Sequence, residues 1–143
     1  MIARETAYAA LFAKLSTVAG FNTISRQLKH WSEVAPPDQP ALFQVQGKQI
    51  AETTADNIPT RWKLMAELYV YVQNTDPASG FSCTTLNNLV DAIDGVLAAT
   101  PGYRQTLGGV VEHCRIAGEI ETDEGVLGAQ AVAIIQIEIF PEP

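Results

Sequence analysis

The residues that could support catalysis are few and far apart in this sequence. His30 and His113 are the only imidazoles, and Cys83 and Cys114 are the only thiols. His113 and Cys114 are adjacent in a stretch with strand character, and neighbouring strand residues point to opposite faces, so this pair does not form a nucleophile and its base. A thiol hydrolase would need Cys83 to meet His113, and no pattern in the sequence supports that contact.

An acidic cluster near the C-terminus is the one candidate for a metal site. It comprises Glu119, Glu121, Asp123 and Glu124. A calcium loop needs denser oxygen ligands at set positions around a glycine, so we interpret the cluster as a solvated hairpin tip. Gly108-Gly109 lacks the flanking pattern of a phosphate-binding loop, and no GxSxG or HExxH signature occurs. We therefore predict no catalytic residue, no cofactor and no metal.

The composition limits the classes of partner. Nine basic residues against sixteen acidic ones give a net charge of −7, and the basic residues are scattered singly. Such a chain repels phosphate, so we expect no sequence-specific binding to nucleic acid. With 47% hydrophobic and 17% charged residues, it has a well-filled core or apolar surface kept for a partner. We see no signal peptide and no apolar run of membrane-spanning length, and expect a soluble cytoplasmic protein.

The first part of the chain is predicted to contain one helix and two strands. Residues 3–19 have helical apolar spacing, and residues 21–28 alternate like a short strand. The proline-rich segment 31–40 is expected to be a loop with at most one helical turn. A strand follows over residues 40–47. The polar residues 48–59 are expected to form an exposed, mobile loop that proteases cut early.

Residues 60–73 have the clearest strand pattern in the sequence. Strict alternation between apolar and more polar residues is typical of a half-buried antiparallel strand. The strand is longer than usual, so we expect a bulge or a projecting end. Its apolar row comprises Trp62, Leu64, Ala66, Leu68, Val70 and Val72.

A second amphipathic helix is predicted after a turn-rich connection. Ser82 or Thr84 would cap its N-terminus, its apolar stripe covers residues 86–97, and Thr100-Pro101-Gly102 would end it. The core is predicted where both helices meet the long strand. Its members are Leu11, Leu15, Leu64, Leu68, Val70, Leu89, Ile93 and Leu97.

Two further strands close the chain. Residues 110–121 and 128–140 are predicted to form a hairpin with an acidic turn at 122–125, and Gly118 suggests a bulge. Two amphipathic helices can cover only one face of a sheet. We therefore expect one α+β domain over residues 1–143, a mixed, mainly antiparallel sheet of about four to five strands with two helices packed on one face.

Apolar residues also occur on the other face of the predicted sheet. Two explanations are open. Either the segment 31–40 packs there, or the face contacts a partner, since Tyr, Met and large apolar groups suit interfaces. The candidate subunit-interface residues are Met65, Tyr69, Tyr71, Val132, Ile134 and Phe140.

The layout resembles the tail terminator and minor tail proteins of long-tailed bacteriophages. The resemblance extends from the first helix to Phe140. Each motif in it is short, and none carries catalysis. The motifs are Pro40-Ala41-Leu42-Phe43, Arg61-Trp62 with Tyr69-Val70-Tyr71-Val72, Thr106-Leu107-Gly108-Gly109-Val110, Gly118-Glu119-Ile120-Glu121, and Leu127-Gly128.

The resemblance implies a structural virion protein and not an enzyme. Such a subunit caps the finished tail tube as a homohexameric ring, ends tube growth and offers the surface for joining to the head connector. The implied partners are further copies of the chain, the tail tube protein and the head–tail connector protein, with DNA passing through the lumen. The implied location is the head–tail junction of the virion, and the host cytoplasm during assembly.

Other functions stay open at this point. One is a head–tail connector stopper or a tail tube protein. Another is a small cytoplasmic ligand-binding module that uses space between the helices and the sheet. A third is a hydrolase that uses Cys83 or His113. Oligomeric state separates the virion roles from the others.

Overall fold

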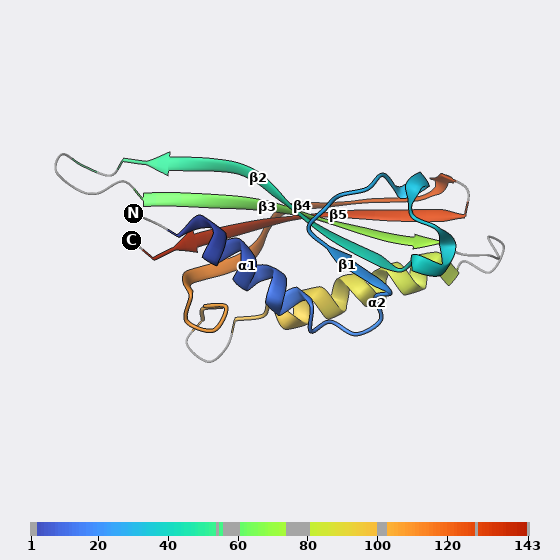
Figure 1. The fold of residues 1–143 in the computed structure, drawn as a ribbon, viewed down its shortest axis with the longest axis horizontal. Helices are drawn as coiled ribbons and strands as arrows, with labels where there is room; N and C mark the ends of the chain where they lie inside the picture. Colours follow the sequence, from blue (N-terminus) through green and yellow to red (C-terminus); the bar gives the residue numbers. More distant parts are fainter. Residues whose placement is uncertain are drawn as a thin grey trace.

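The structure is a computed structural model that describes residues 3–53, 55, 61–73, 81–99, 103–127 and 129–142. Within these residues, one five-stranded sheet carries both helices on one face (Figure 1). None of the helices described is long and apolar enough to cross a membrane. The elements are α1 (Arg4–Leu15), β1 (Thr23–Ser25), the 3-10 turns η1 (Trp31–Glu33) and η2 (Pro36–Asp38), β2 (Ala41–Glu52), β3 (Arg61–Gln73), α2 (Phe81–Val96), β4 (Val111–Leu127) and β5 (Gln130–Pro141).

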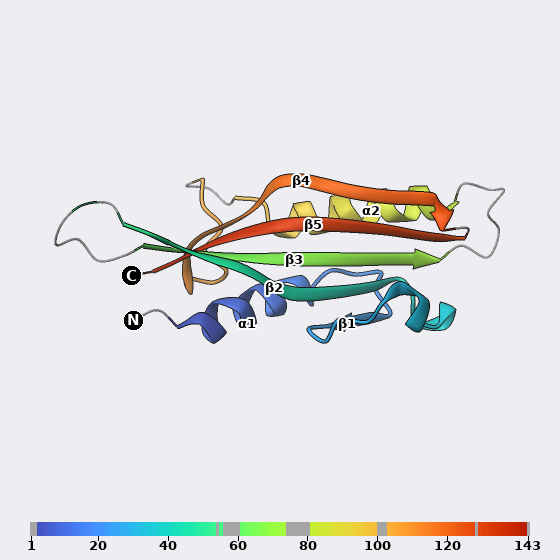
Figure 2. The same ribbon diagram turned by 90° about the horizontal axis from the view of Figure 1, so that it is seen from above.

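The sheet order is β1-β2-β3-β5-β4, which Figure 2 shows from above. Only the short β1 runs parallel to its neighbour, with Thr23 opposite Ala41, and the other pairs are antiparallel. The α+β fold class, the mainly antiparallel sheet and the placement of both helices on one face are confirmed. The order leaves β4 at one edge and β1 with β2 at the other.

The main core lies between the helices and the sheet. All eight residues predicted for it are at most 7% exposed. The alternation predicted for residues 60–73 is confirmed, because Leu64, Ala66, Leu68 and Val70 of β3 are fully buried. Tyr8 of α1 adds a polar tie, since its hydroxyl donates to the Met65 carbonyl at 3.0 Å. The helices therefore close one face of the sheet completely along its centre.

Two strands are longer than the sequence indicates. β2 continues to Glu52, so the prediction of a loop from residue 48 is wrong for its first part, and residues 56–59 of that loop lie outside the described residues. β4 runs to Leu127, so the acidic turn at 122–125 is also wrong. Glu121 and Asp123 instead pair with Ile134 and Val132 of β5. Polar side chains are compatible with an edge strand because the backbone ladder, not the side chain, makes its hydrogen bonds.

Smaller differences concern the ends of elements. β1 covers only three residues of the predicted strand 21–28, and α1 ends at Leu15. α2 already includes Ser82 and Thr84, so neither is its N-cap, and its predicted end at residues 100–102 lies outside the described residues. The predicted bulge at Gly118 is confirmed by a register shift between Ile116 and Ile120 and by a φ of 78°.

Candidate contact surface on the open sheet face

The sheet face opposite the helices, called the open face below, is partly covered by the chain itself. Figure 1 shows η1 above the sheet, on the side away from both helices, and η2 at the right-hand end of the sheet. Its Val34 joins a second apolar cluster with Phe43 of β2, Tyr71 of β3 and Val132 of β5. Of the two explanations that the sequence left open, packing by segment 31–40 therefore holds for this part of the face. The segment forms two 3-10 turns, one more than expected.

Tyr71 is central to this second cluster. It is 4% exposed, its ring centroid lies 5.5 Å from that of Phe43, and its hydroxyl donates to the Lys29 carbonyl at 2.7 Å. Burial raises the pKa of the Tyr71 phenol. Val132 is 9% exposed beside it. Both residues thus serve the fold of the subunit, and a partner could reach them only by displacing the covering segment.

The other four candidate interface residues are more accessible. Met65, Tyr69, Ile134 and Phe140 are half-buried on β3 and β5. Tyr69 is the register partner of Ile134, and Tyr71 is the partner of Val132. The two rows that looked separate in the sequence therefore lie side by side on one face. Glu67, Gln136 and Glu138 of the same face lie between the Tyr69–Ile134 pair and the residues Met65 and Phe140. The sequence pattern could not show this, because strand neighbours are set by the order β3-β5.

Tyr69 has an unusual environment on this face. Its hydroxyl donates to a Glu67 carboxylate oxygen at 2.8 Å. Burial, the hydrogen bond to Glu67 and the Glu67 charge together raise the pKa of Tyr69 to about 12. The phenol therefore stays protonated and acts as a fixed hydrogen-bond donor.

Charged and aromatic groups surround Phe140 near the end of β5. The His113 ring stacks on Phe140 with centroids 6.4 Å apart, and the Arg115 guanidinium carbon lies 5.5 Å from the Phe140 centroid. The Glu138 carboxylate lies 2.9 Å from Arg115 and 3.6 Å from Lys63. Apolar groups with a charged border are typical of protein interfaces.

The geometry at the candidate catalytic residues disfavours thiol chemistry at Cys114. This residue is fully buried in the main core, and desolvation raises the pKa of its thiol to about 12. A reactive cysteine needs a lowered pKa, because the thiolate is the nucleophile. His113 lies on the open face, as the strand alternation predicted, and its Nδ1 accepts the Gln105 backbone N–H at 3.2 Å. Among the described residues, no group of three or more His, Cys, Asp or Glu could hold a metal ion.

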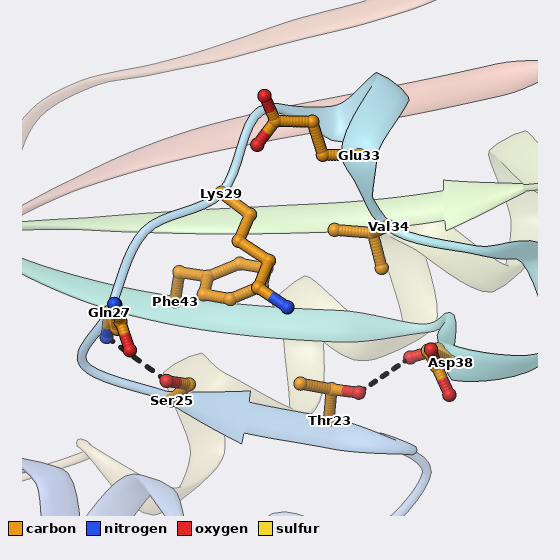
Figure 3. A pocket seen from close by; sticks show the side chains of 8 residues that line it. All are labelled: Thr23, Ser25, Gln27, Lys29, Glu33, Val34, Asp38 and Phe43. Atoms are coloured by element: carbon orange, nitrogen blue, oxygen red, sulfur yellow. Dashed lines mark hydrogen bonds between the residues drawn. The ribbon is translucent and has the colours of Figure 1, made fainter.

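The described residues line three hollows on or beside the open face. The first has a volume of about 170 Å³ and lies between β1, β2 and the covering segment, where Figure 3 shows Thr23, Lys29, Val34 and Phe43 on its walls. A second of about 260 Å³ lies beside Trp31, and a third of about 240 Å³ lies between Lys48 and Met65. Sites for drug-sized ligands hold roughly 300–1,000 Å³. All three hollows are smaller than that, and none of them lies between the helices and the sheet, where the ligand-binding module would need its site.

No protein-family model matches the sequence, and no curated protein sequence does either. Solved structures do share the fold. One is a chain of the virion of a native gene transfer agent particle, with 9% identity and a TM-score of 0.51, covering 99% of this chain and 92% of that chain. Another solved chain has 14% identity and a TM-score of 0.55, covering 100% of this chain and 99% of its own length. At these identities the likeness concerns the fold alone, and that fold extends over this whole chain.

Proposed function

We propose that this protein is a structural virion protein that acts by self-association. In this proposal it is a tail terminator subunit, which forms a homohexameric ring on the finished tail tube, ends tube growth and joins the tube to the head connector. The observation that carries the proposal is the end-to-end similarity in fold to a chain of a gene transfer agent virion. The finer role comes from the resemblance of the sequence motifs to tail terminators.

Residues of the motifs behind that resemblance make contacts that shape this fold. Trp62 lies under the Arg4 guanidinium, whose carbon is 4.6 Å from the ring centroid, and so joins β3 to α1. The Thr106 carbonyl accepts the N–H groups of Gly109, Val110 and Val111 and shapes the entry into β4. Gly118 forms a bulge. Residues that shape turns and bulges favour a shared architecture over a shared chemistry, which supports a non-enzymatic role.

The exposed part of the open face supports contact with other proteins. We propose Met65, Tyr69, Ile134 and Phe140 as contact residues for a neighbouring subunit or for the tube. The buried cluster around Tyr71 packs against two of these residues, Tyr69 and Ile134. The net charge of −7 suits a ring through which DNA passes without sticking. The tail tube protein and the head–tail connector are the proposed further partners, at the head–tail junction.

The test is a capping assay on growing tail tubes followed by electron microscopy. Adding the purified protein should place a ring at one end of each tube and shorten the tubes. Once every tube carries a ring, further protein should not change the tube length. A variant with Ile134→Asp should fold but fail to cap, because a carboxylate pressed into an apolar contact stays unpaired. Asp91→Ala, on the outer side of α2, is the matched control and should cap normally.

Each other outcome points to a different role. Tubes built from this protein alone would replace the terminator by the tail tube alternative. Rings that bind the connector but leave tube growth unchanged would replace it by the stopper alternative. A protein that stays monomeric and leaves the tubes unchanged would overturn the proposal.

A further inference from the structure

Both sheet edges are open over part of their length. β4, with 17 residues, pairs with β5 on one side and with no other strand among the described residues. β2 is covered on its outer side by β1 only at Ala41–Phe43. From Gln44 to Glu52 it has β3 as its one strand neighbour within the described residues. An open edge offers unpaired backbone donors and acceptors to another chain.

Each open edge also carries an exposed isoleucine. Ile50 on β2 and Ile120 on β4 are both 40% exposed. Large apolar side chains are otherwise mostly buried in the two clusters of this protein. Ile120 pairs with the buried Ile135 and lies on the helix side of the sheet, whereas Ile50 pairs with Lys63 and lies on the open face. In a continued sheet each isoleucine would therefore contact the neighbouring copy on a different face.

The exposed charges differ between the two edges. Glu119 and Glu121 of β4 are exposed, and none of the ion pairs described involves them. On the open part of β2, Lys48 and Glu52 are both exposed, and none of the ion pairs described involves either of them. Like charges directly opposite each other destabilise a strand pair, whereas opposite charges stabilise it. Pairing of β4 with another β4 is therefore disfavoured, whereas β2 of another copy offers Glu119 and Glu121 an opposite charge at Lys48, four residues before Glu52.

The register of the sheet shows how such a contact would be staggered. Ile120 pairs with Ile135, Ile135 pairs with Leu68, and Leu68 pairs with Gln44, so Ile120 and Gln44 lie at one level. Lys48 lies four residues beyond Gln44. The bulge between Gln46 and Gln49 takes up one of these residues, so at about 3.3 Å per residue the stagger amounts to roughly 10 Å. The stagger also places Glu119 and Glu121 of β4 beyond β1, which covers the outer side of β2 at Ala41–Phe43.

Stagger of this kind is what a closed assembly needs. A sheet closes into a barrel only when its strands tilt and the register shifts around the ring. β4 runs antiparallel to β2 within one subunit, because three antiparallel pairs separate them. A contact between β4 and the next β2 thus continues the alternation of strand directions. Two different edges in contact make a heterologous interface, which generates a ring when the rotation between successive copies closes.

We propose that copies of this chain join edge to edge, the Glu119–Glu121 part of β4 docking on the Lys48–Ile50 part of β2 in the next copy. This contact deepens the proposed function and rests on it, since it says how the ring is held together. The open face then carries the remaining contacts of the ring, with neighbouring copies, the tube or the connector.

The test is a charge exchange between the two edges. Glu119→Lys with Glu121→Lys should raise the dissociation constant of the assembly roughly tenfold to a hundredfold. Lys48→Glu should also raise this dissociation constant. All three changes in one chain should restore most of the lost affinity. The control is Asp91→Lys with Asp94→Lys on α2, which changes the net charge by the same amount as Glu119→Lys with Glu121→Lys. It should leave assembly unchanged. Sedimentation velocity gives the dissociation constants, and thermal melting confirms that each variant is folded.

The outcomes separate this contact from the proposed function. Wild-type rings together with unaffected edge variants would overturn the edge contact and leave the ring proposal standing. Folded edge variants that lose assembly without rescue by the exchanged charges would overturn the charge pairing. A wild type that never assembles would overturn both proposals.

Discussion

The two faces of the sheet are built in different ways. On the helix side, α1 and α2 bring long apolar side chains onto β3 and β5, and residues such as Leu68 and Ile135 are fully buried. On the open face of the same two strands, a short proline-rich segment covers only Tyr71, Val132 and their neighbours. The helix side therefore supplies stability, whereas the open face is left with surface that the subunit itself does not use.

The largest expected effect belongs to the helix side. Leu68→Ala or Ile93→Ala should lower the free energy of unfolding by about 2–5 kcal/mol, because each leaves a cavity in the main core. Urea denaturation measures the change, and Ile134→Ala on the open face should cost clearly less. Losses below about 0.5 kcal/mol at both core positions would mean that the two faces are assigned the wrong way round.

A smaller effect is expected where the covering segment meets the open face. Tyr71→Phe removes the hydrogen bond to the Lys29 carbonyl and should cost about 0.5–1.5 kcal/mol in urea denaturation. Tyr69→Phe is the matched control, because its hydroxyl contacts the half-exposed Glu67 and no covering segment. Equal costs at both sites would argue against a special role for the segment. Tyr71→Asp tests folding, not assembly, since Tyr71 lies inside the subunit.

The same difference between faces explains what the sequence could predict. The helix side follows from periodicity, because burial against one layer selects every second residue of β3 and every third or fourth of the helices. The eight core residues were predicted for that reason. The bulge at Gly118 followed from a glycine inside an apolar strand.

The edges and the open face could not be predicted in this way. Residues 48–52 and 122–125 are polar, and polarity alone indicated loop and turn, although backbone pairing with β3 and β5 keeps them extended. The two candidate rows were predicted correctly as residues of one face of each strand. Their position side by side depends on the order β3-β5, which a single sequence does not contain. The packing of segment 31–40 on the open face depends on contacts between residues far apart in the sequence. The sequence therefore left it as one of two explanations.

A weaker effect is expected at the charged border of the open face. Glu138→Gln removes the carboxylate between Lys63 and Arg115 and should cost about 0.2–1 kcal/mol, since surface ion pairs contribute little. The cost, measured by urea denaturation, should shrink at high salt. A cost that does not change with salt would show that packing, and not charge, accounts for the contribution of Glu138.

The smallest effect is confined to alkaline solution. The pKa of Tyr69 is raised to about 12 from 10.0 in the folded protein, so the unfolded chain loses its proton first. This contribution to stability is full below pH 10 and is lost as the pH rises towards 12. The difference in stability between wild type and Tyr69→Phe should therefore narrow in that window. The pKa values of Tyr8 and Tyr71 are raised as well, so ultraviolet titration should show one fewer late-ionising tyrosine in the variant than in the wild type. An unchanged titration curve would refute the assignment.

The central claim is that spare surface on the open face and the sheet edges serves self-association. Native mass spectrometry of the purified wild type tests it most directly, over a series of protein concentrations and with tail tubes present. The account predicts a closed homo-oligomer, a hexamer in the proposed role, whose mass stays fixed as concentration rises. A monomer under every condition, in a protein that is folded by thermal melting, would contradict it.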